Sequence, residues 1–220
     1  MRLQPDKPKI LIVTAVDLER KAVLEGIDKA KHVDVLIGGV GPIDSAVNTT
    51  LALSNQQYDI VINMGIGGGF RGRTEIGSVV VASQLIAADF GVETPTGFHF
   101  ADTFQLGSAK IAVEHGLRER MVNALKRAGL KVDTGPILTV STVTGTHSTA
   151  IEMQKRVPDA MAEAMEGFGV AVAARKMQVP VLEIRAISNM VGQRDKASWR
   201  IEDALASLTK TSRRLMEVWQ

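Results

Sequence analysis

Two acidic residues flank a methionine in the segment Glu163-Ala164-Met165-Glu166-Gly167. The segment lies between an apolar stretch and a helix-like stretch rich in small residues. A methionine can pack against a purine ring, and a neighbouring carboxylate can accept hydrogen bonds from ribose hydroxyls. The same residues could instead be helix-cap acids beside a core methionine. The pattern therefore leaves a nucleoside site and a purely structural role both open.

A third carboxylate, Glu19, follows the apolar stretch 10–13 and lies where a helix is expected to begin. Ligands of α/β proteins bind beyond the carboxyl ends of the strands, so this side chain could face a substrate. An acidic residue at a helix start also commonly balances the helix dipole. Glu19 is therefore a candidate for either role.

A run of glycines, Gly65-Ile66-Gly67-Gly68-Gly69, follows the apolar stretch 59–63. We expect a loop in which backbone N–H groups approach a polyhydroxyl or anionic ligand, although a plain structural turn would use the same residues. The run matches neither the dinucleotide-binding pattern nor the P-loop of nucleotide triphosphatases. Those two classes of nucleotide-binding protein are therefore not supported.

The apolar stretch 181–187 contains an arginine, Arg185, and is followed by Ser188 and Asn189. A buried arginine needs an acidic partner, so at least one carboxylate should lie beside it. At the carboxyl end of this strand the amide of Asn189 could face the edge of a base, or it could simply begin a turn.

Several other kinds of function lack their required residues. The sequence has no cysteine, the four histidines show no metal-ligand spacing, and no Gly-x-Ser-x-Gly motif is present. No metal and no cofactor are therefore expected. With 26 Lys and Arg against 24 Asp and Glu, and no basic stripe, we expect no nucleic-acid or membrane partner, but a small molecule.

Short β-branched stretches alternate with stretches of helical period along the chain, which predicts a mixed or parallel sheet covered by helices on both faces. The expected strands are 10–13, 33–37, 59–63, 78–82, 137–143 and 181–187, and the expected helices are 17–24, 43–53, 109–128, 149–156, 166–177 and 201–219.

The chain is expected to be one domain over residues 1–220, because no linker or repeat interrupts the alternation. Residues 91–107 are irregular and predict a long functional loop. The apolar run 10–16 is too short for a secretory signal or a membrane span, so we expect a cytoplasmic protein.

Taken together in chain order, four segments resemble the nucleoside phosphorylase/nucleosidase superfamily, and especially its small hydrolases of methylthioadenosine and S-adenosylhomocysteine. They are Ala15-Val16-Asp17-Leu18-Glu19, Asn63-Met64-Gly65-Ile66-Gly67-Gly68-Gly69, Glu163-Ala164-Met165-Glu166 and Arg185-Ala186-Ile187-Ser188-Asn189. The resemblance implies a three-layer α/β fold, in which a central mixed sheet curls into a partial barrel with flanking helices. It also implies a homodimer or a larger homo-oligomer.

By the same resemblance Glu19 positions and activates the attacking water, and Glu166 binds the ribose hydroxyls. Met165 would pack on the ribose and the base, and Gly65, Gly67 and Gly68 would contact the substrate. Two positions depart from the adenosine-specific hydrolases: Ile66 replaces a serine, and Asn189 replaces an aspartate.

The change at Asn189 bears on the base that is released. An aspartate can protonate N7 and accept from the adenine amino group, whereas an amide accepts from a developing N7–H and donates to a 6-oxo oxygen. A site built for one such pattern rejects the mismatched analogue, because buried polar groups are left unpaired. Asn189 therefore favours a 6-oxopurine as the leaving base.

A hydrolase with this asparagine resembles the futalosine hydrolases of menaquinone biosynthesis. Further matching segments are Glu93-Thr94-Pro95-Thr96-Gly97-Phe98, Glu166-Gly167-Phe168-Gly169-Val170-Ala171 and Ser188-Asn189-Met190-Val191-Gly192-Gln193-Arg194-Asp195, followed by Trp199 and Ala204-Leu205. The resemblance implies hydrolysis of futalosine to hypoxanthine and dehypoxanthine futalosine. Arg71, Arg73 or Arg194 could then meet the aromatic carboxylate on the 5′ side of the substrate.

Three alternatives remain open at this point. A phosphate-dependent purine nucleoside phosphorylase would need an anion pocket, and Glu19 argues against it, because a carboxylate beside the nucleophile repels phosphate. A nucleosidase of the methylthioadenosine/S-adenosylhomocysteine type would use the same fold. A non-catalytic nucleoside-binding protein could also keep the fold, although the presence of both Glu19 and Glu166 argues for catalysis.

Overall fold

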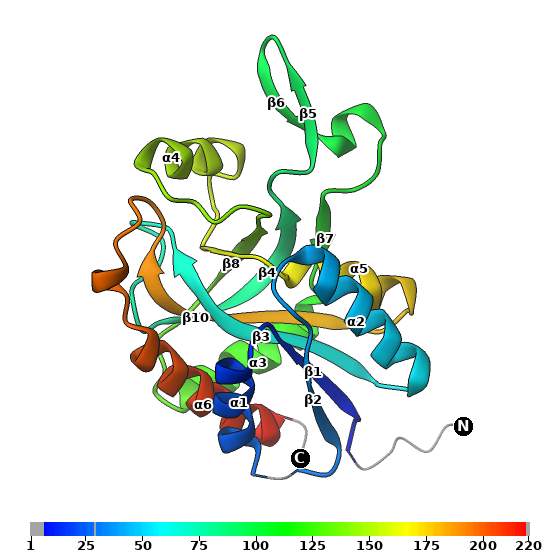
Figure 1. The fold of residues 1–220 in the computed structure, drawn as a ribbon. Coiled ribbons are helices and arrows are strands. Elements are labelled where there is room, and N and C mark those ends of the chain that lie inside the picture. Colours follow the sequence, from blue (N-terminus) through cyan, green and yellow to red (C-terminus); the bar gives the residue numbers. More distant parts are fainter. Residues whose placement is uncertain (1–6, 29, 219–220) are drawn as a thin grey trace.

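The apolar stretches of the sequence form the strands of one eight-stranded sheet in the computed structural model, which describes residues 7–28 and 30–218 (Figure 1). The strands are β1 (Ile10–Thr14), β2 (Val33–Ile37), β3 (Ile60–Gly69), β4 (Val79–Ala87), β7 (Lys110–Ala112), β8 (Val132–Thr139), β9 (Ala162–Ala164) and β10 (Val181–Met190). Both parallel and antiparallel pairs occur, as the expected mixed sheet requires.

The sheet closes on itself over five of its strands. Its order is β10-β4-β8-β9-β3-β1-β2, and β10 pairs a second time with β3, so that β3, β10, β4, β8 and β9 form a small barrel. The parallel pairing of β1 with β3 extends the sheet beyond the barrel. This closure confirms the expected partial barrel.

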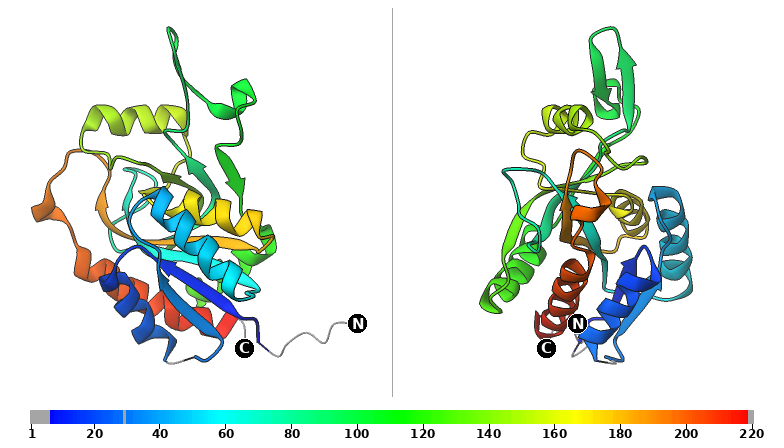
Figure 2. Two further views of the ribbon diagram at one scale, coloured as in Figure 1. Left: turned by 45° about the vertical axis from the view of Figure 1, so that its right-hand side comes forward. Right: turned by 60° about the vertical axis from the view of Figure 1, so that its left-hand side comes forward.

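Six α-helices cover the sheet in the described part of the chain: α1 (Asp17–Ile27), α2 (Pro42–Asn55), α3 (His115–Arg127), α4 (His147–Arg156), α5 (Gly167–Lys176) and α6 (Ile201–Val218). Helices α1, α3 and α6 pack together on one side, and α2 packs against α5 on the other (Figure 2). Helix α6 buries Ala204, Leu208, Thr211 and Leu215, whose spacing of three to four residues forms one continuous stripe. The three-layer fold class is therefore confirmed.

The glycine run proves to be part of a strand rather than a loop. Gly65 to Gly69 are the last five residues of β3, where Gly68 pairs with Asn189 of β10 on one side and with Glu163 of β9 on the other. Hydrogen bonds to two neighbouring strands hold this backbone extended, although glycine has little strand preference of its own. The expected strand ended at residue 63 because glycine carries no apolar signal.

Two further boundaries differ from expectation. The helix expected over 109–128 is wrong at its start, because Lys110–Ala112 forms β7 against β4 and α3 begins only at His115. Strand β9, which spans three residues, is absent from the expected strand ranges, although a junction of a strand and a helix was expected near Glu163. Both strands are short, and their pairing partners lie far away in the sequence, so local periodicity did not reveal them.

Residues 91–107 also form regular structure where an irregular loop was expected. Strands β5 (Gly91–Thr94) and β6 (Gly97–Phe100) make a hairpin that projects from the barrel, followed by the short 3-10 helix η1 (Ala101–Phe104) (Figure 1). The guanidinium of Arg156 lies 3.9 Å from the ring centre of Phe98 and ties the hairpin to α4. No residue of 91–107 lines the cavity described below. Within the described residues, no helix is long and apolar enough to cross a membrane.

Candidate active site

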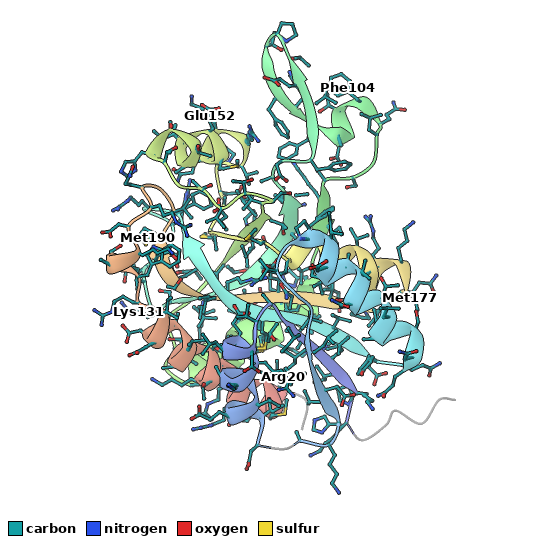
Figure 3. All side chains as sticks on the ribbon, in the orientation of Figure 1. Arg20, Phe104, Lys131, Glu152, Met177 and Met190 are labelled. Carbon is teal, nitrogen blue, oxygen red and sulfur yellow. The ribbon has the colours of Figure 1, made fainter. Side chains whose placement is uncertain are left out.

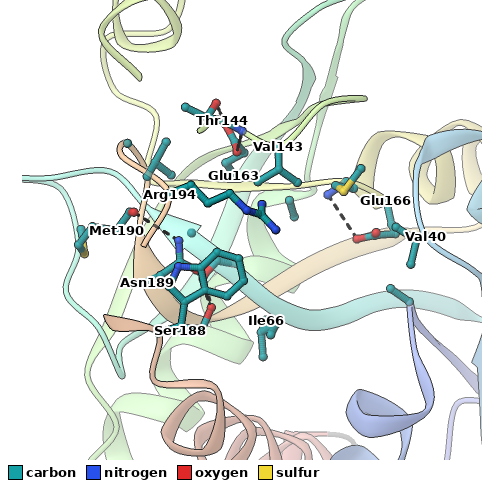
Figure 4. Close-up of a pocket in the computed structure, with 18 of the residues that line it drawn as sticks. Val40, Ile66, Val143, Thr144, Glu163, Glu166, Ser188, Asn189, Met190 and Arg194 are labelled. Carbon is teal, nitrogen blue, oxygen red and sulfur yellow. Dashed lines mark hydrogen bonds between the residues drawn. The ribbon is translucent and has the colours of Figure 1, made fainter. Parts of the chain in front are cut away.

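A cavity of about 380 Å³ opens where the carboxyl ends of β3 and β10 meet β9 (Figure 4). Met190, which lines this cavity, is labelled among the side chains in Figure 3. Its walls come from six segments that are far apart in the sequence, so only the folded chain brings them together: residues 15–19, 40, 66–68, 143–144, 163–166 and 188–199. The lining residues used below are Glu19, Ile66, Gly67, Gly68, Val143, Thr144, Glu163, Met165, Glu166, Ser188, Asn189, Arg194 and Trp199.

Glu19 lies in the first turn of α1 and also lines this cavity. Its Oε2 accepts hydrogen bonds from the backbone N–H groups of Ala15 at 2.8 Å and Val16 at 3.3 Å. Its Oε1 accepts from the N–H of Ile66 in β3 at 2.9 Å. The carboxylate therefore caps the helix start and also borders the cavity.

Arg185 is the buried centre of the charged groups behind the cavity. Its Nε lies 2.9 Å from Oε1 of Glu183, and its Nη1 lies 3.2 Å from Oε2 of Glu166. Its Nη2 donates to the side-chain oxygen of Asn63. The expected acidic partners are present, and they hold the guanidinium in one orientation.

Gly65 does not line the cavity, contrary to its expected contact with substrate. A Cβ atom at this position would lie 2.6 Å from Nη1 of Arg185 and 2.6 Å from Oε1 of Glu19. The missing side chain therefore lets Arg185 and Glu19 approach each other behind the cavity wall. Gly67 and Gly68, in contrast, lie on the wall as expected.

Met165 and Glu166 lie between β9 and α5, at the strand-to-helix junction that the sequence indicated. Glu166 is 4 % exposed, and its Oε1 accepts from the backbone N–H of Gly41 at 3.2 Å. Its Oε2 faces Arg185. Met165 is half-buried and lies beside it on the cavity wall.

Asn189 is the second-last residue of β10 and follows an irregularity in the strand. The register with β3 shifts between Ile187 and Asn189, so Ser188 is an extra residue and both polar side chains reach the cavity. The side-chain oxygen of Asn189 accepts from the Ser188 hydroxyl at 2.8 Å, and its Nδ2 donates to the Met190 carbonyl at 3.3 Å. These contacts fix which atom of the amide faces which way.

Glu163 is a further buried carboxylate on the cavity wall, and local patterns assigned it no role separate from that of Glu166. It is 5 % exposed. Its Oε1 accepts from the backbone N–H of Thr144 at 2.8 Å, and its Oε2 accepts from the hydroxyl of the same residue. The signal that could have found Glu163 is its position in the sequence, three residues before Glu166 and on the short strand β9.

Of the three arginines considered for a 5′ carboxylate, the structure places only Arg194 in the cavity wall. Its guanidinium lies 5.3 Å from the ring centre of Trp199, which lines the same cavity. Arg71 and Arg73 are exposed outside it, and Nη2 of Arg73 donates to the carbonyl of Pro158 at 2.7 Å. Figure 4 shows the Arg194 side chain extending into the cavity.

Burial controls the protonation of the carboxylates around Arg185. Loss of hydration raises the pKa of Glu19, although the charge of Arg185 and two backbone N–H groups oppose the shift. Burial raises the pKa of Glu183 to about 7, against the opposing charge of Arg185. Glu163 likewise has a raised pKa because it is buried. A carboxylate with a raised pKa is a better general base once it is ionised.

No group of three or more potential metal-ligating side chains occurs among residues 7–28 and 30–218. The cavity instead combines three polar side chains: the carboxylate of Glu19 at the start of α1, the carboxylate of Glu166 paired with Arg185, and the amide of Asn189 at the end of β10. Such a set can bind a polyhydroxyl ring, accept a proton from water and hydrogen-bond a heterocyclic base.

Comparisons with known proteins identify the family of the chain. The model of the phosphorylase superfamily matches residues 17–219. A futalosine hydrolase of Streptomyces coelicolor is 42 % identical over 96 % of this chain and 97 % of its own length. A futalosine hydrolase of Acidothermus cellulolyticus is 40 % identical over 96 % of this chain and 91 % of its own length.

The fold has close counterparts among solved structures. A 5′-methylthioadenosine/S-adenosylhomocysteine nucleosidase from Neisseria meningitidis superposes with a TM-score of 0.83, at 21 % identity over 94 % of this chain and 98 % of that one. That likeness confirms the nucleoside phosphorylase-like fold. With the sequence relationships above, it follows that the chain belongs to the phosphorylase superfamily and, within it, to the futalosine hydrolase family.

Proposed function

We propose that this chain is an N-ribosyl hydrolase that cleaves futalosine to hypoxanthine and dehypoxanthine futalosine in menaquinone biosynthesis. The observation that carries the proposal is the meeting of Glu19, Glu166 and Asn189 on one cavity wall. The names of the two relatives at 40 and 42 % identity support the same activity.

In the proposed reaction Glu19 acts as the general base. It accepts a proton from a water molecule whose oxygen forms the new bond to C1′, while the bond from C1′ to N9 breaks and its electron pair passes to the base. Ile66 N–H, Ala15 N–H and Val16 N–H hold the carboxylate of Glu19 in place for this transfer. A base held in position is worth about 10² to 10⁴ in rate.

Glu166 is proposed to bind the ribose hydroxyls. The ribose ring gains positive charge as the glycosidic bond breaks, so a carboxylate beneath it binds the transition state more strongly than the substrate. Arg185 keeps Glu166 oriented, and Met165 supplies an apolar surface next to it.

Asn189 is proposed to stabilise the leaving base. The departing purine takes a proton from solvent at N7, and the side-chain oxygen of Asn189 accepts from that N–H while Nδ2 donates to O6. The Ser188 hydroxyl already donates to the same oxygen, so the amide is held in the orientation that a 6-oxopurine needs. An adenine would meet this amide with a mismatched edge, which disfavours the methylthioadenosine alternative.

Phosphorolysis is disfavoured by the charges behind the cavity. Arg185 is paired with Glu166 and Glu183, and Glu19 contributes a further carboxylate beside it. A phosphate ion approaching C1′ would therefore meet acidic groups whose nearby cation is already neutralised.

One assay tests the proposal against its alternatives. Purified protein is given futalosine, inosine and methylthioadenosine, each with and without phosphate and a metal chelator, and the released bases are identified. We expect hypoxanthine from futalosine in every condition. Strict phosphate dependence would indicate a phosphorylase, faster release of adenine would indicate the other nucleosidase class, and no release of any base would indicate a non-catalytic binding protein.

We further propose that Arg194, beside Trp199, receives the aromatic carboxylate on the 5′ side of futalosine, because an arginine pairs well with a carboxylate and an indole stacks on a ring. Arg194→Ala should then raise KM for futalosine more than KM for inosine, whereas Arg200→Ala, outside the cavity, should change neither. We also propose that the chain acts as a single cytoplasmic domain in a homodimer or larger homo-oligomer, which light scattering of the purified protein would test.

A further inference from the structure

Glu163 and Asn189 lie on either side of the same residue in the sheet. Asn189 of β10 pairs with Gly68 of β3, and Gly68 pairs with Glu163 of β9. Residues that pair directly across neighbouring strands direct their side chains to the same face of the sheet. The amide and the carboxylate therefore border one opening from two sides.

Gly68 leaves the space between them empty. Two strand spacings separate the Cα atoms of Asn189 and Glu163 by about 10 Å. A Cβ at Gly68 would lie 3.3 Å from Nδ2 of Asn189 and 2.9 Å from Cγ2 of Val191. The absence of that side chain leaves a backbone floor on which a flat ring can rest between the two polar groups.

Glu163 is prepared to accept a further hydrogen bond. Thr144 donates once to each of its two oxygens, which uses two of about four acceptor positions on a carboxylate. No Lys, Arg or His of the described residues lies within ion-pair distance of Glu163, so the remaining acceptor positions are not taken by a cation. The carboxylate of Glu163 can therefore accept a hydrogen bond from a donor on the occupant of the cavity.

The proposed function places the ribose at the other end of the cavity, beside Glu166. In Figure 4, Glu163 and Asn189 lie toward one side of the cavity and Glu166 lies toward the other. If the ribose rests near Glu166, the base must reach the side where Glu163 and Asn189 lie. The six-membered ring of a 6-oxopurine carries O6 next to an N1–H donor, whereas N1 of adenine is an acceptor.

We propose that Glu163 accepts the hydrogen bond from N1–H of the 6-oxopurine, while Asn189 binds its N7 and O6. The assignment rests on the proposed function, since it takes the base to be a 6-oxopurine. Glu163 is thus a second specificity-determining residue. It contacts N1, the ring nitrogen that is a hydrogen-bond donor in hypoxanthine and an acceptor in adenine. The carboxylate repels the lone pair of adenine N1 and accepts from the N1–H of hypoxanthine.

The test measures binding of free bases, so it does not depend on turnover. Dissociation constants of hypoxanthine, 1-methylhypoxanthine and adenine are determined by calorimetry for the wild type, Glu163→Gln, Glu163→Ala and the control Glu152→Gln. Glu152 lies on α4, exposed and paired with Lys155, outside the cavity. Circular dichroism of each variant checks that it is folded.

We expect the wild type and Glu152→Gln to prefer hypoxanthine over 1-methylhypoxanthine by about tenfold or more, because methylation removes the donor. In Glu163→Ala the ratio of the dissociation constant of 1-methylhypoxanthine to that of hypoxanthine should fall close to one. Glu163→Gln should move the preference from hypoxanthine toward adenine, because Thr144 can hold the amide oxygen with its N–H and leave the amide NH₂ to face N1.

An unchanged ratio in a folded Glu163→Ala would overturn the assignment of Glu163. Equal affinity of the wild type for 1-methylhypoxanthine and hypoxanthine would overturn it as well. Release of hypoxanthine from futalosine by the wild type is measured separately. If that release occurs while the ratio is unaffected, only the role of Glu163 is wrong; if neither release nor binding occurs, the proposed function fails and the role of Glu163 fails with it.

Discussion

Nη1 of Arg185 lies 3.2 Å from Oε2 of Glu166, and the two side chains are only 1 % and 6 % exposed. Removing one member of a buried ion pair leaves an uncompensated charge and typically costs about 3 to 5 kcal/mol. Arg185 has a second acidic partner in Glu183, so a Glu166 variant still leaves the guanidinium paired. The contribution of Glu166 to the reaction can therefore be tested in a folded protein.

Replacing Glu166 with alanine should lower kcat and raise KM together. The carboxylate is proposed to hold the ribose hydroxyls in the ground state and to bind more strongly as the ring becomes cationic. The measurement is steady-state kinetics on a ribonucleoside and on its 2′,3′-dideoxy analogue. If both substrates lose the same factor, Glu166 does not contact the hydroxyls.

Replacing Glu19 with glutamine should lower kcat by about 10²-fold or more and leave substrate binding largely intact. The amide keeps the size of the side chain but cannot accept the proton from water. Glu25→Gln, on the exposed side of the same helix, is the matched control and should leave kcat unchanged. A wild-type kcat in Glu19→Gln would remove this residue from the mechanism.

The pH dependence of kcat should follow the ionisation of Glu19. The base form is the carboxylate, and burial raises its pKa, so activity should be lost as the pH falls through a range above that of an ordinary glutamate. The pH profile of kcat, taken with futalosine at saturation, checks this. A profile that stays flat to pH values below about 4.3 would contradict the raised pKa.

Replacing Asn189 with aspartate should shift the preference from hypoxanthine toward adenine. A carboxyl group can accept from a 6-amino group and protonate N7, but it loses the donor that faced O6, which costs about 1 to 3 kcal/mol of transition-state binding for the 6-oxo substrate. The measurement is kcat/KM for a 6-oxo and 6-amino nucleoside pair with the same 5′ group. The same ratio in both proteins would mean that Asn189 does not face the base.

Stability should fall as the pH rises from about 5 to 8, and Glu183 should account for part of the fall. Its pKa is about 7 in the folded chain, so between about 4.3 and 7 the folded state keeps a proton that the unfolded state has lost. The free energy of unfolding therefore decreases with pH across this window, by about 4 kcal/mol in total from this group. Urea unfolding at several pH values should show a shallower slope in Glu183→Gln; an identical slope would place the pKa of Glu183 near its ordinary value.

The fold and part of the site could be predicted from the sequence because they depend on local patterns. The alternation of β-branched and helical stretches located most strands and helices to within a few residues. Glu19 and Asn189 were found because each follows an apolar strand, at the sheet edge where α/β proteins bind ligands. The acid expected beside Arg185 follows from the cost of burying an unpaired charge.

Other features depend on contacts between distant segments, and local patterns carry no sign of them. Gly65 looked like a ligand contact, but its lack of a side chain instead lets Arg185 approach Glu19, and the three residues belong to different strands and a helix. Glu163 becomes significant only when β9 pairs with β3 and places it opposite Gly68. Pairing registers of this kind follow from the closure of the barrel.

The cavity floor at Gly67 and Gly68 has a consequence for inhibitor design. Main-chain atoms are the same whatever side chains surround them, so a flat compound packed on this floor would keep that contact in most variants. A side chain on the floor itself would place Cβ 2.9 Å from the Glu163 carbonyl at position 67, or 2.9 Å from Cγ2 of Val191 at position 68. Substitutions at positions 67 and 68 that block the inhibitor would therefore also disturb the substrate site. Resistance is therefore expected to arise at the rim, where the exposed Val143 can change without moving a strand.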